Sequence, residues 1–375
     1  MMARLDQICK LNMGQSPDSS SYNENKMGMP FFQGNADFGT LHPTIRIWCS
    51  APTKVANPGD ILISVRAPIG ALNIANVECC IGRGLAALAV DERKCKKEYL
   101  WHAISSKVDE LNSKGTGSTF KAISKNILAE TEIPLPNLDM QTHIAAVLDK
   151  IDNLISFRKQ QLARLDELVK ARFVEMFGDP ISNPHGFDKV DLSELADIKI
   201  GPFGSLLHKE DYIEGGYALL NPSHIIDGKI APDSKLTVSR EKYEELSAYR
   251  LKAGDVVMGR RGEMGRCAVV PCDGYLCGTG SLLIRTKGDV TADYIQKIIS
   301  FPSFKKAIED MAVGQTMPNL NVPIVSSFQI IKPPIEVQHS YYAFVEQTDK
   351  SKAVIQKALD EAQLLFDSLM QKYFG

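Results

Sequence analysis

The chain of 375 residues has no excess of charge of either sign, because 43 Lys and Arg stand against 45 Asp and Glu, for a net charge of −2. Simple DNA-binding domains usually carry a basic surplus, so this balance argues against that class. No run approaches the roughly 18 apolar residues that span a bilayer, and the start, MMARLDQICK, lacks the apolar stretch of a signal peptide. With 44% hydrophobic residues the chain can bury real cores, and its length predicts two domains.

Cysteine pairs with metal-binding spacing are also missing. None of the eight cysteines forms a C-x-x-C pair, and Cys79 and Cys80 are adjacent. Cys267, Cys272 and Cys277 are evenly spaced, but a zinc knuckle needs closer pairs and a fourth ligand. We therefore expect no metal, and mostly buried, reduced thiols in a cytoplasmic protein.

Motifs of catalysis are equally absent. The sequence contains no G-x-S-x-G, Walker A, H-E-x-x-H or EF-hand pattern. GRRGEMGR (259–266) does not match a dinucleotide-binding loop, and NPSH (221–224) lacks the second Pro and the aromatic residue of an amino-methyltransferase motif. We expect no catalytic residue in this chain.

What the chain does contain is the same pattern twice. PGDILISVRAPIG (58–70) aligns with AGDVVMGRRGEMG (253–265) at an offset of 195 residues. Further matches follow at offsets of 196 and 197: Gly82 and Gly84 with Gly278 and Gly280, GSTFKAI (117–123) with GQTMPNL (314–320), and PNLDMQ (136–141) with PPIEVQ (333–338). Such a period is far too long for a solenoid repeat, so it predicts a duplicated domain with different loop lengths.

Each copy has two parts of different character. The first part mixes short β-branched runs with turns rich in Gly, Pro and Asn, and has helical patterns at 98–111 and 292–310. A Pro-rich break, IPLPNLD or IKPPIEV, then precedes a long helical segment. The predicted fold class is α+β, with two mixed α/β domains (1–138 and 180–335), each followed by a long helix (139–179 and 336–375).

Apolar residues recur along both helical segments with a period of 3.5 residues, which is typical of a left-handed coiled coil. In the first helix the apolar residues of this seam are Ile144, Leu148, Ile151, Ile155, Leu162, Leu165 and Val169; the same steps also pass through Arg158 and lead on to Arg172 and Met176. In the second helix the main seam residues are Ile355, Leu359, Phe366 and Leu369. One such stripe alone is also compatible with packing on its own globular domain. Two copies of equal length favour pairing with each other, as an antiparallel coiled coil with pseudo-two-fold symmetry.

With catalytic motifs absent, the residues most suited to binding a ligand are planar and polar side chains in loops. Arg makes bidentate contacts with guanine, Gln and Asn make them with adenine, and Lys, Ser and Thr bind phosphates. We therefore predict DNA contacts from Gln33, Arg66, Lys114, Ser118, Thr119 and Lys121 in the first copy, and from Asn221, Arg260, Arg261, Gln315, Thr316 and Asn319 in the second. Because both copies have Arg at the position of Arg66 and Arg261, a structural ion pair is an equally supported alternative for these two.

The order of GDIL, RxxxG, GSTFKAIS and IPLPNLDMQTHIAAVLDKIDNLI, with the whole arrangement repeated, resembles the specificity subunits of type I restriction–modification systems. The resemblance covers essentially the whole chain. It implies two target recognition domains that read a bipartite, asymmetric site on double-stranded DNA, separated by a spacer that the paired helices fix. It also implies two methylation subunits as partners, which bind S-adenosylmethionine and modify adenine, and restriction subunits that use ATP. This chain itself would bind no cofactor.

Two other classes remain open. A self-contained DNA-modifying enzyme would bind S-adenosylmethionine itself, and a coiled-coil adaptor would join proteins without contacting DNA.

Overall fold

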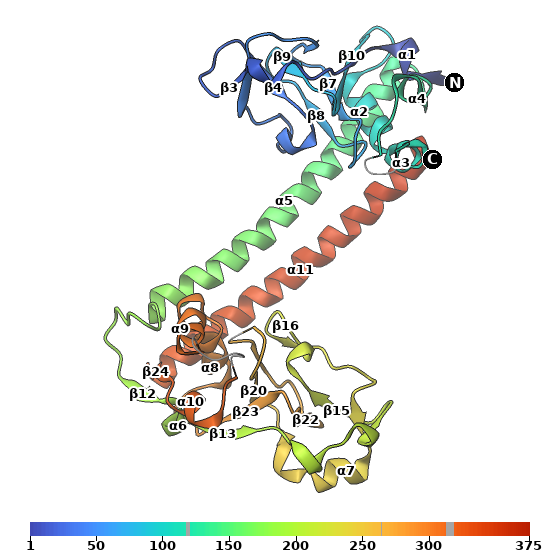
Figure 1. The fold of residues 1–375 in the computed structure, drawn as a ribbon. Coiled ribbons are helices and arrows are strands. Elements are labelled where there is room, and N and C mark those ends of the chain that lie inside the picture. The colour runs from blue at the N-terminus through green and yellow to red at the C-terminus, as the bar shows by residue number, and fades with distance from the viewer. Residues whose placement is uncertain (118–120, 264, 313–318) are drawn as a thin grey trace. The chain divides into compact units, whose positions relative to one another are not determined.

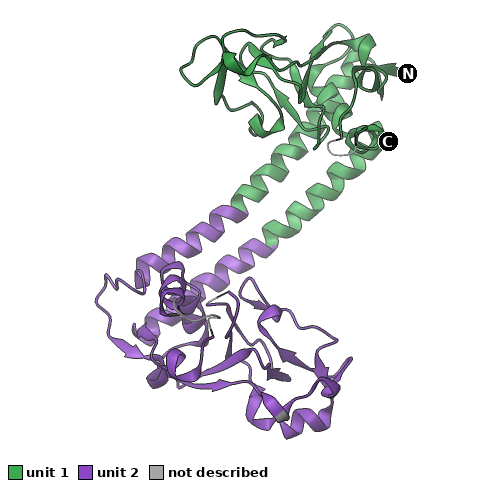
Figure 2. Cartoon of the chain, in the orientation of Figure 1, with its two compact units in different colours: residues 1–161, 354–375 green, residues 162–353 purple. Residues whose placement is uncertain are grey.

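The computed structural model describes residues 1–117, 121–263, 265–312 and 319–375. The chain divides into two compact units (Figures 1 and 2). Unit 1 consists of residues 1–161 and 354–375, and unit 2 of residues 162–353. Each unit thus contains a mixed α/β domain together with part of each long helix.

Unit 1 is built on three small sheets. A two-stranded sheet pairs β1 (Met2–Arg4) with β11 (Glu132–Pro134), and a four-stranded antiparallel sheet has the order β2 (Cys9–Met13), β10 (Leu85–Val90), β7 (Ile61–Ser64), β8 (Leu72–Ile74). A five-stranded sheet has the order β3 (Tyr22–Asn23), β5 (Ile47–Cys49), β4 (Met29–Phe32), β9 (Cys79–Ile81), β6 (Val55–Ala56). In this sheet β4 and β9 are parallel. The short helices are α1 (Leu5–Ile8), α2 (Lys97–Ser105), α3 (Val108–Lys114) and α4 (Lys125–Ala129).

Unit 2 repeats this plan strand for strand. The two-stranded sheet pairs β12 (Lys189–Asp191) with β24 (Gln329–Ile331), and the four-stranded sheet has the order β13 (Ala196–Ile200), β23 (Ser281–Thr286), β20 (Val256–Gly259), β21 (Cys267–Val269). The five-stranded sheet has the order β14 (Tyr212–Ile213), β18 (Thr237–Val238), β15 (Tyr217–Leu220), β22 (Tyr275–Cys277), β19 (Arg250–Leu251), again with one parallel pair. An added hairpin joins β16 (Ile225–Ile226) and β17 (Lys229–Ile230), and the helices are α6 (Leu192–Leu195), α7 (Arg240–Glu245), α8 (Ala292–Ile299), α9 (Pro302–Ala312) and α10 (Val322–Ser326). The duplication predicted from the sequence is confirmed at the level of topology.

The helical patterns at 98–111 and 292–310 each form two helices instead of one. In unit 1 the break lies between α2 and α3, and in unit 2 between α8 and α9. Pro302 starts α9, because proline fits the first turn of a helix and interrupts a preceding one. Thr291 caps α8 by accepting a hydrogen bond from the Tyr294 N–H.

The long helices are α5 (Leu138–Phe177) and α11 (Ile335–Phe374), each of 40 residues. Both begin just after the Pro-rich break, as the sequence predicts: α11 directly follows Pro334, and α5 follows Pro136 with Asn137 between them. A buried Gln near each start fixes the helix to its own α/β domain. Gln141 accepts a 2.8 Å hydrogen bond from the Lys96 N–H and donates to the Lys94 and Pro136 carbonyls. Gln338 accepts from the Thr291 N–H at 3.0 Å and donates to the Pro333 carbonyl.

Within each unit, α5 and α11 pack antiparallel. In unit 2, Tyr341 lies against Phe173 and Phe177, while Lys352, further along α11, pairs with Asp166, which is earlier in α5. In unit 1 the first turns of α5 and the last turns of α11 contribute to one hydrophobic core, in which Phe374 contacts Tyr99. The expected antiparallel pairing is therefore present in both units.

Candidate nucleic-acid interface

In unit 1, three polar residues lie just after strands that end at the same edge. Two of them are predicted DNA contacts, and the third is an arginine close to them. Gln33 comes directly after β4, Arg66 follows β7 by two residues, and Arg83 lies in the Gly82–Gly84 loop between β9 and β10. The backbone joins these segments, because the Gly84 N–H donates to the Gln33 carbonyl at 3.1 Å and the Val65 N–H donates to the Gly84 carbonyl at 2.9 Å. Gln33 and Arg66, 33 positions apart in sequence, are thus brought to one place.

The close approach of these segments requires glycine. A Cβ atom on Gly84 would lie 2.5 Å from the Gln33 carbonyl oxygen, closer than any side chain permits. In unit 2 a Cβ on Gly278, which matches Gly82, would lie 2.3 Å from Oδ1 of Asn221. The glycine pairs that reveal the duplication therefore serve to hold neighbouring loops together.

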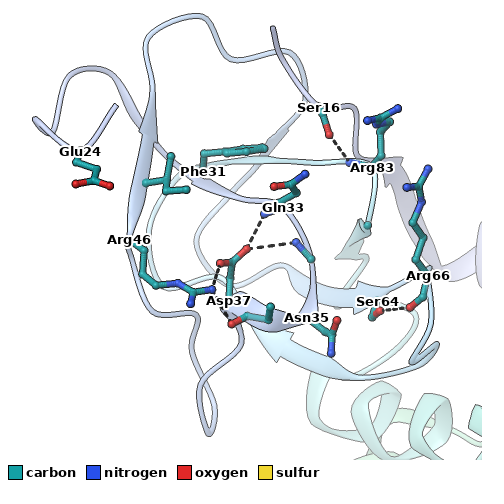
Figure 3. Close-up of a pocket in the computed structure, with 14 residues that line it drawn as sticks. Ser16, Glu24, Phe31, Gln33, Asn35, Asp37, Arg46, Ser64, Arg66 and Arg83 are labelled. Carbon is teal, nitrogen blue, oxygen red and sulfur yellow. Dashed lines mark hydrogen bonds and ion pairs between the residues drawn. The ribbon is translucent and has the colours of Figure 1, made fainter. Parts of the chain in front are cut away.

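This edge of unit 1 carries a concave pocket of about 530 Å³ (Figure 3). Its labelled lining residues are Ser16, Glu24, Phe31, Gln33, Asn35, Asp37, Arg46, Ser64, Arg66 and Arg83. In the view of Figure 3, Arg66 and Arg83 lie on one flank of the pocket, and Arg46 and Glu24 on the other. Phe31 stacks on Tyr22 with 4.8 Å between ring centroids, so the floor of the pocket is fixed by aromatic packing.

The arginines of this pocket differ in their surroundings. Arg46 forms an ion pair of 2.5 Å with Asp37, whose other carboxylate oxygen accepts a 2.7 Å hydrogen bond from the Gln33 N–H. Arg66 and Arg83 are exposed, and among the described residues neither has an ion-pair partner. The structural ion pair considered for Arg66 is therefore not found within the described part of the chain.

The remaining predictions for unit 1 fall on the adjoining loop. The Ala67 N–H donates to the Lys121 carbonyl at 3.0 Å, which places exposed Lys121 beside the Arg66 segment. Lys114 is exposed at the end of α3, with its Nζ 2.6 Å from Glu110 Oε1, so its charge is partly neutralised. Ser118 and Thr119 lie outside the described residues.

In unit 2 the matching edge brings together Arg260, Arg261 and Asn319. Nε of Arg261 is 3.5 Å from Oδ1 of Asn319, whereas Nε of Arg260 donates to the Leu320 carbonyl at 2.9 Å. Partial burial and the neighbouring Arg261 lower the pKa of Arg260. Arg261 is exposed and, like Arg66, has no ion-pair partner among the residues that the structure describes.

Asn221 follows β15 as Gln33 follows β4, and its side chain is half-buried against Gly278. Gln315 and Thr316 lie outside the described residues. Arg83 and Arg46 were not among the predicted contacts. The position of Arg83 between two glycines that match across the copies is the signal in the sequence that points to it.

The predicted seam residues are on the inner faces of the helices. Ile144, Leu148, Ile155, Val169 and Leu359 are buried, and Ile151, Leu162, Leu165, Ile355, Phe366 and Leu369 are half-buried. At the end of α5 the buried residues are Phe173 and Phe177, where the strict 3.5-residue step gives Arg172 and Met176. These two rings are part of the core of the α/β domain in unit 2, so contacts with that domain determine which face of α5 is buried at its end.

Across the described ranges, no three His, Cys, Asp or Glu side chains gather as metal ligands. Seven of the eight cysteines are buried, with Cys272 exposed. No helix in the described part of the chain is long and apolar enough to cross a membrane.

Comparisons with known proteins agree with this architecture. A family model described as the type I restriction modification DNA specificity domain matches the chain twice, over residues 1–167 and 184–363. A putative type I restriction enzyme specificity subunit, MjaX of Methanocaldococcus jannaschii, is 42% identical over 161 residues, which cover 43% of this chain and 38% of that protein. This chain thus spans less than half the length of that relative.

Two further likenesses extend over the full length. The EcoBI specificity subunit of Escherichia coli is 20% identical over 99% of this chain and 84% of its own length. Among solved structures, the S subunit of a type I restriction–modification system from M. genitalium has a TM-score of 0.63 at 16% identity, covering 100% of this chain and 96% of that one. At this identity the likeness concerns the fold.

Proposed function

We propose a function from one premise: this chain belongs to the family of type I restriction–modification DNA specificity proteins. Units 1 and 2 each read one half of a bipartite DNA target, through the loop edges that carry Gln33 and Arg66 in one unit and Asn221 and Arg261 in the other. The chain itself is not catalytic. It directs methylation subunits, and restriction subunits where they are present, to that target in the cytoplasm.

The observation that carries this proposal is the repeated edge with different side chains. The same backbone arrangement recurs in both units, which supports a shared task of binding a duplex. The side chains on it differ, since Gln33 is matched by Asn221 and Arg83 by Thr279. The two units therefore have the same backbone arrangement but present different side chains. This combination favours an asymmetric target with two unlike half-sites.

The outer faces of the helices support a role in recruiting partners. Phe157 is 62% exposed on α5, and Val354 and Leu364 are 71% and 70% exposed on α11. Large apolar side chains that stay in solvent are typical of protein interaction surfaces. We propose that methylation subunits, two of them, dock there and bring S-adenosylmethionine, while ATP is bound by the restriction subunits.

A methylome tests this function. The chain is co-expressed with its methylation subunit in a host without other adenine methylation, and modified sites are read by single-molecule sequencing. The expected result is one motif made of two specified half-sites around an unspecified spacer. The control is the methylation subunit expressed alone. A variant without β13 to β24 is unsuitable, because α5 and α11 would lose the α/β core against which they pack. Methylation without a bipartite motif would contradict the proposal.

The same readout tests whether the helices set the spacer. A heptad inserted after Leu154 in α5, with a second heptad between Leu359 and Phe366 in α11, lengthens both helices and keeps the 3.5-residue seam in phase. We expect a longer spacer and unchanged half-sites. Altered half-sites with an unchanged spacer would show that the helices do not act as a ruler.

A further inference from the structure

Three positions on the loop edge correspond between the units by strand register. In the parallel pairs, Phe32 lies opposite Ile81 and Leu220 opposite Cys277, so Gln33 corresponds to Asn221 and Arg83 to Thr279. In the antiparallel pairs, Ser64 lies opposite Leu85 and Gly259 opposite Ser281, so Arg66 corresponds to Arg261. One of the three positions carries the same residue in both units, and two carry different residues.

This division matches the two kinds of contact that a DNA reader makes. The phosphate backbone is the same at every step, so a residue that binds it has the same task in both units. Base edges differ between half-sites, so the residues that read them are expected to differ. An arginine present in both units fits a phosphate, and the position occupied by Arg83 in one unit and Thr279 in the other fits a base.

The surroundings of Arg83 suit a base-reading side chain. Its backbone is fixed, because its N–H donates to Ser16 Oγ at 3.2 Å and the flanking Gly82 and Gly84 both donate to the strand end that carries Gln33. Its side chain is exposed at the pocket and unpaired among the described residues, in contrast to Arg46, which is neutralised by Asp37. A fixed backbone with a free guanidinium presents the planar fork that matches O6 and N7 of guanine.

We infer that Arg83 reads a guanine in the half-site bound by unit 1, and that Arg66 and Arg261 bind backbone phosphates. This inference deepens the proposed function and rests on it. Unit 2 has no such guanine reader at the corresponding position, since Thr279 has neither the length nor the two parallel donors.

The test uses the complex with the methylation subunit and duplexes derived from the methylome motif. Each base pair of the unit 1 half-site is replaced in turn, and dissociation constants are measured. Arg83→Thr copies the residue that unit 2 carries at this place, so the fold tolerates it. We expect wild type to prefer guanine at one position by roughly 5- to 150-fold, and Arg83→Thr to lose this preference there while keeping discrimination at all other positions.

Two more variants separate charge from geometry. Arg83→Lys keeps the charge and loses the fork, so it is expected to lose the guanine preference as well. Arg66→Ala is expected to weaken binding equally for all duplexes and to lower the salt dependence by about one phosphate contact. Arg93→Ala, which removes an exposed arginine paired with Asp91, is the matched control and is expected to bind like wild type.

Two outcomes overturn the inference. If Arg83→Thr weakens every duplex equally, Arg83 is a phosphate contact; if it changes no preference, Arg83 does not touch the DNA. Failure of the proposed function looks different, because wild type would then show no preference between the methylome motif and scrambled DNA. Thermal unfolding of each variant, compared with wild type, separates loss of reading from loss of fold.

Discussion

At the scale of single residues, the repeated Gly-Asp pair is structural and does not line the edge that carries Gln33 and Arg66. Gly59 and Gly254 adopt φ of +92° and +85°, a conformation that favours glycine. Asp60 accepts a 2.9 Å hydrogen bond from the Asn57 N–H, and Asp255 accepts one of 2.7 Å from the Lys252 N–H. The motif that first reveals the duplication thus marks a shared turn before a buried strand.

The two aspartates differ in one respect that predicts unequal effects on stability. Asp255 also binds Arg285 through two hydrogen bonds of 2.7 and 2.6 Å, and this contact raises the pKa of Arg285. Asp60 has no arginine partner among the described residues, and burial raises its pKa. We expect Asp255→Ala to cost about 3 kcal/mol, because it leaves a partly buried arginine without its partner, and Asp60→Ala to cost about 1 kcal/mol.

Urea unfolding followed by circular dichroism measures both losses. Asp188→Ala, at an exposed aspartate of unit 2 whose carboxylate has no hydrogen bond or ion pair within the described residues, serves as the control for a simple change of surface charge. Equal losses for Asp60→Ala and Asp255→Ala would show that the Arg285 pair contributes nothing to stability.

At the scale of elements, the attachment of each long helix depends on one buried amide. Gln141 is fully buried, and its hydrogen bonds with Lys96 and Lys94 join the start of α5 to the segment before α2, while a third binds the Pro136 carbonyl. We expect Gln141→Leu to cost about 2 kcal/mol, since it leaves the partly buried Lys96 N–H and two carbonyls without their partner. Thermal unfolding is expected to shift down by several degrees.

The control for this substitution is Gln160→Leu, at an exposed glutamine on the same helix, which is expected to leave the transition in place. Gln338→Leu in unit 2 is expected to behave as Gln141→Leu does, because its hydrogen bonds are equivalent. If Gln141→Leu unfolds at the same temperature as wild type and Gln160→Leu, the amide does not anchor the helix.

The sequence predicts where both long helices begin and which face is buried. It does not predict the buried residues at the end of α5, where tertiary contacts override the 3.5-residue period. Proline before Leu138 and Ile335 determines where α5 and α11 begin, and the 3.5-residue stripe identifies their inner faces. Phe173 and Phe177 depart from that stripe because they pack into the α/β core, with 4.9 Å between their ring centroids. Periodicity carries no information about which domain a helix end contacts.

The binding edge was predictable in part for a similar reason. Gln33 and Arg66 stand out by residue type in loops, and the structure brings them together. The pairing of Arg46 with Asp37 is not visible in the sequence, because it depends on how the loop after β4 folds back toward β5. Arg83 and Arg46 are both exposed, and the ion pair with Asp37 that distinguishes Arg46 exists only in the folded chain.

At the scale of the whole molecule, the balance of charge predicts weak DNA binding by this chain alone. The net charge of −2 means that the chain has no surplus of cations over acidic residues to attract the phosphate backbone, so the proposed partners supply much of the electrostatic attraction. We expect a mobility-shift assay at 50 and 200 mM salt to show weak binding by the isolated chain and much tighter, more salt-dependent binding with the methylation subunit. Tight, salt-insensitive binding by the isolated chain would contradict this.

The division of the chain into units also dictates the order in which they are completed during synthesis. Unit 2 is one continuous stretch, residues 162–353, whereas the core of unit 1 includes Phe374 from the end of α11. The ribosome therefore releases every residue of unit 2 before the last helical turns of unit 1 exist. The α/β domain of unit 1 is translated first, yet it is the last to acquire its full hydrophobic core. The missing part of that core is the end of α11, which is translated more than 200 residues after the domain itself.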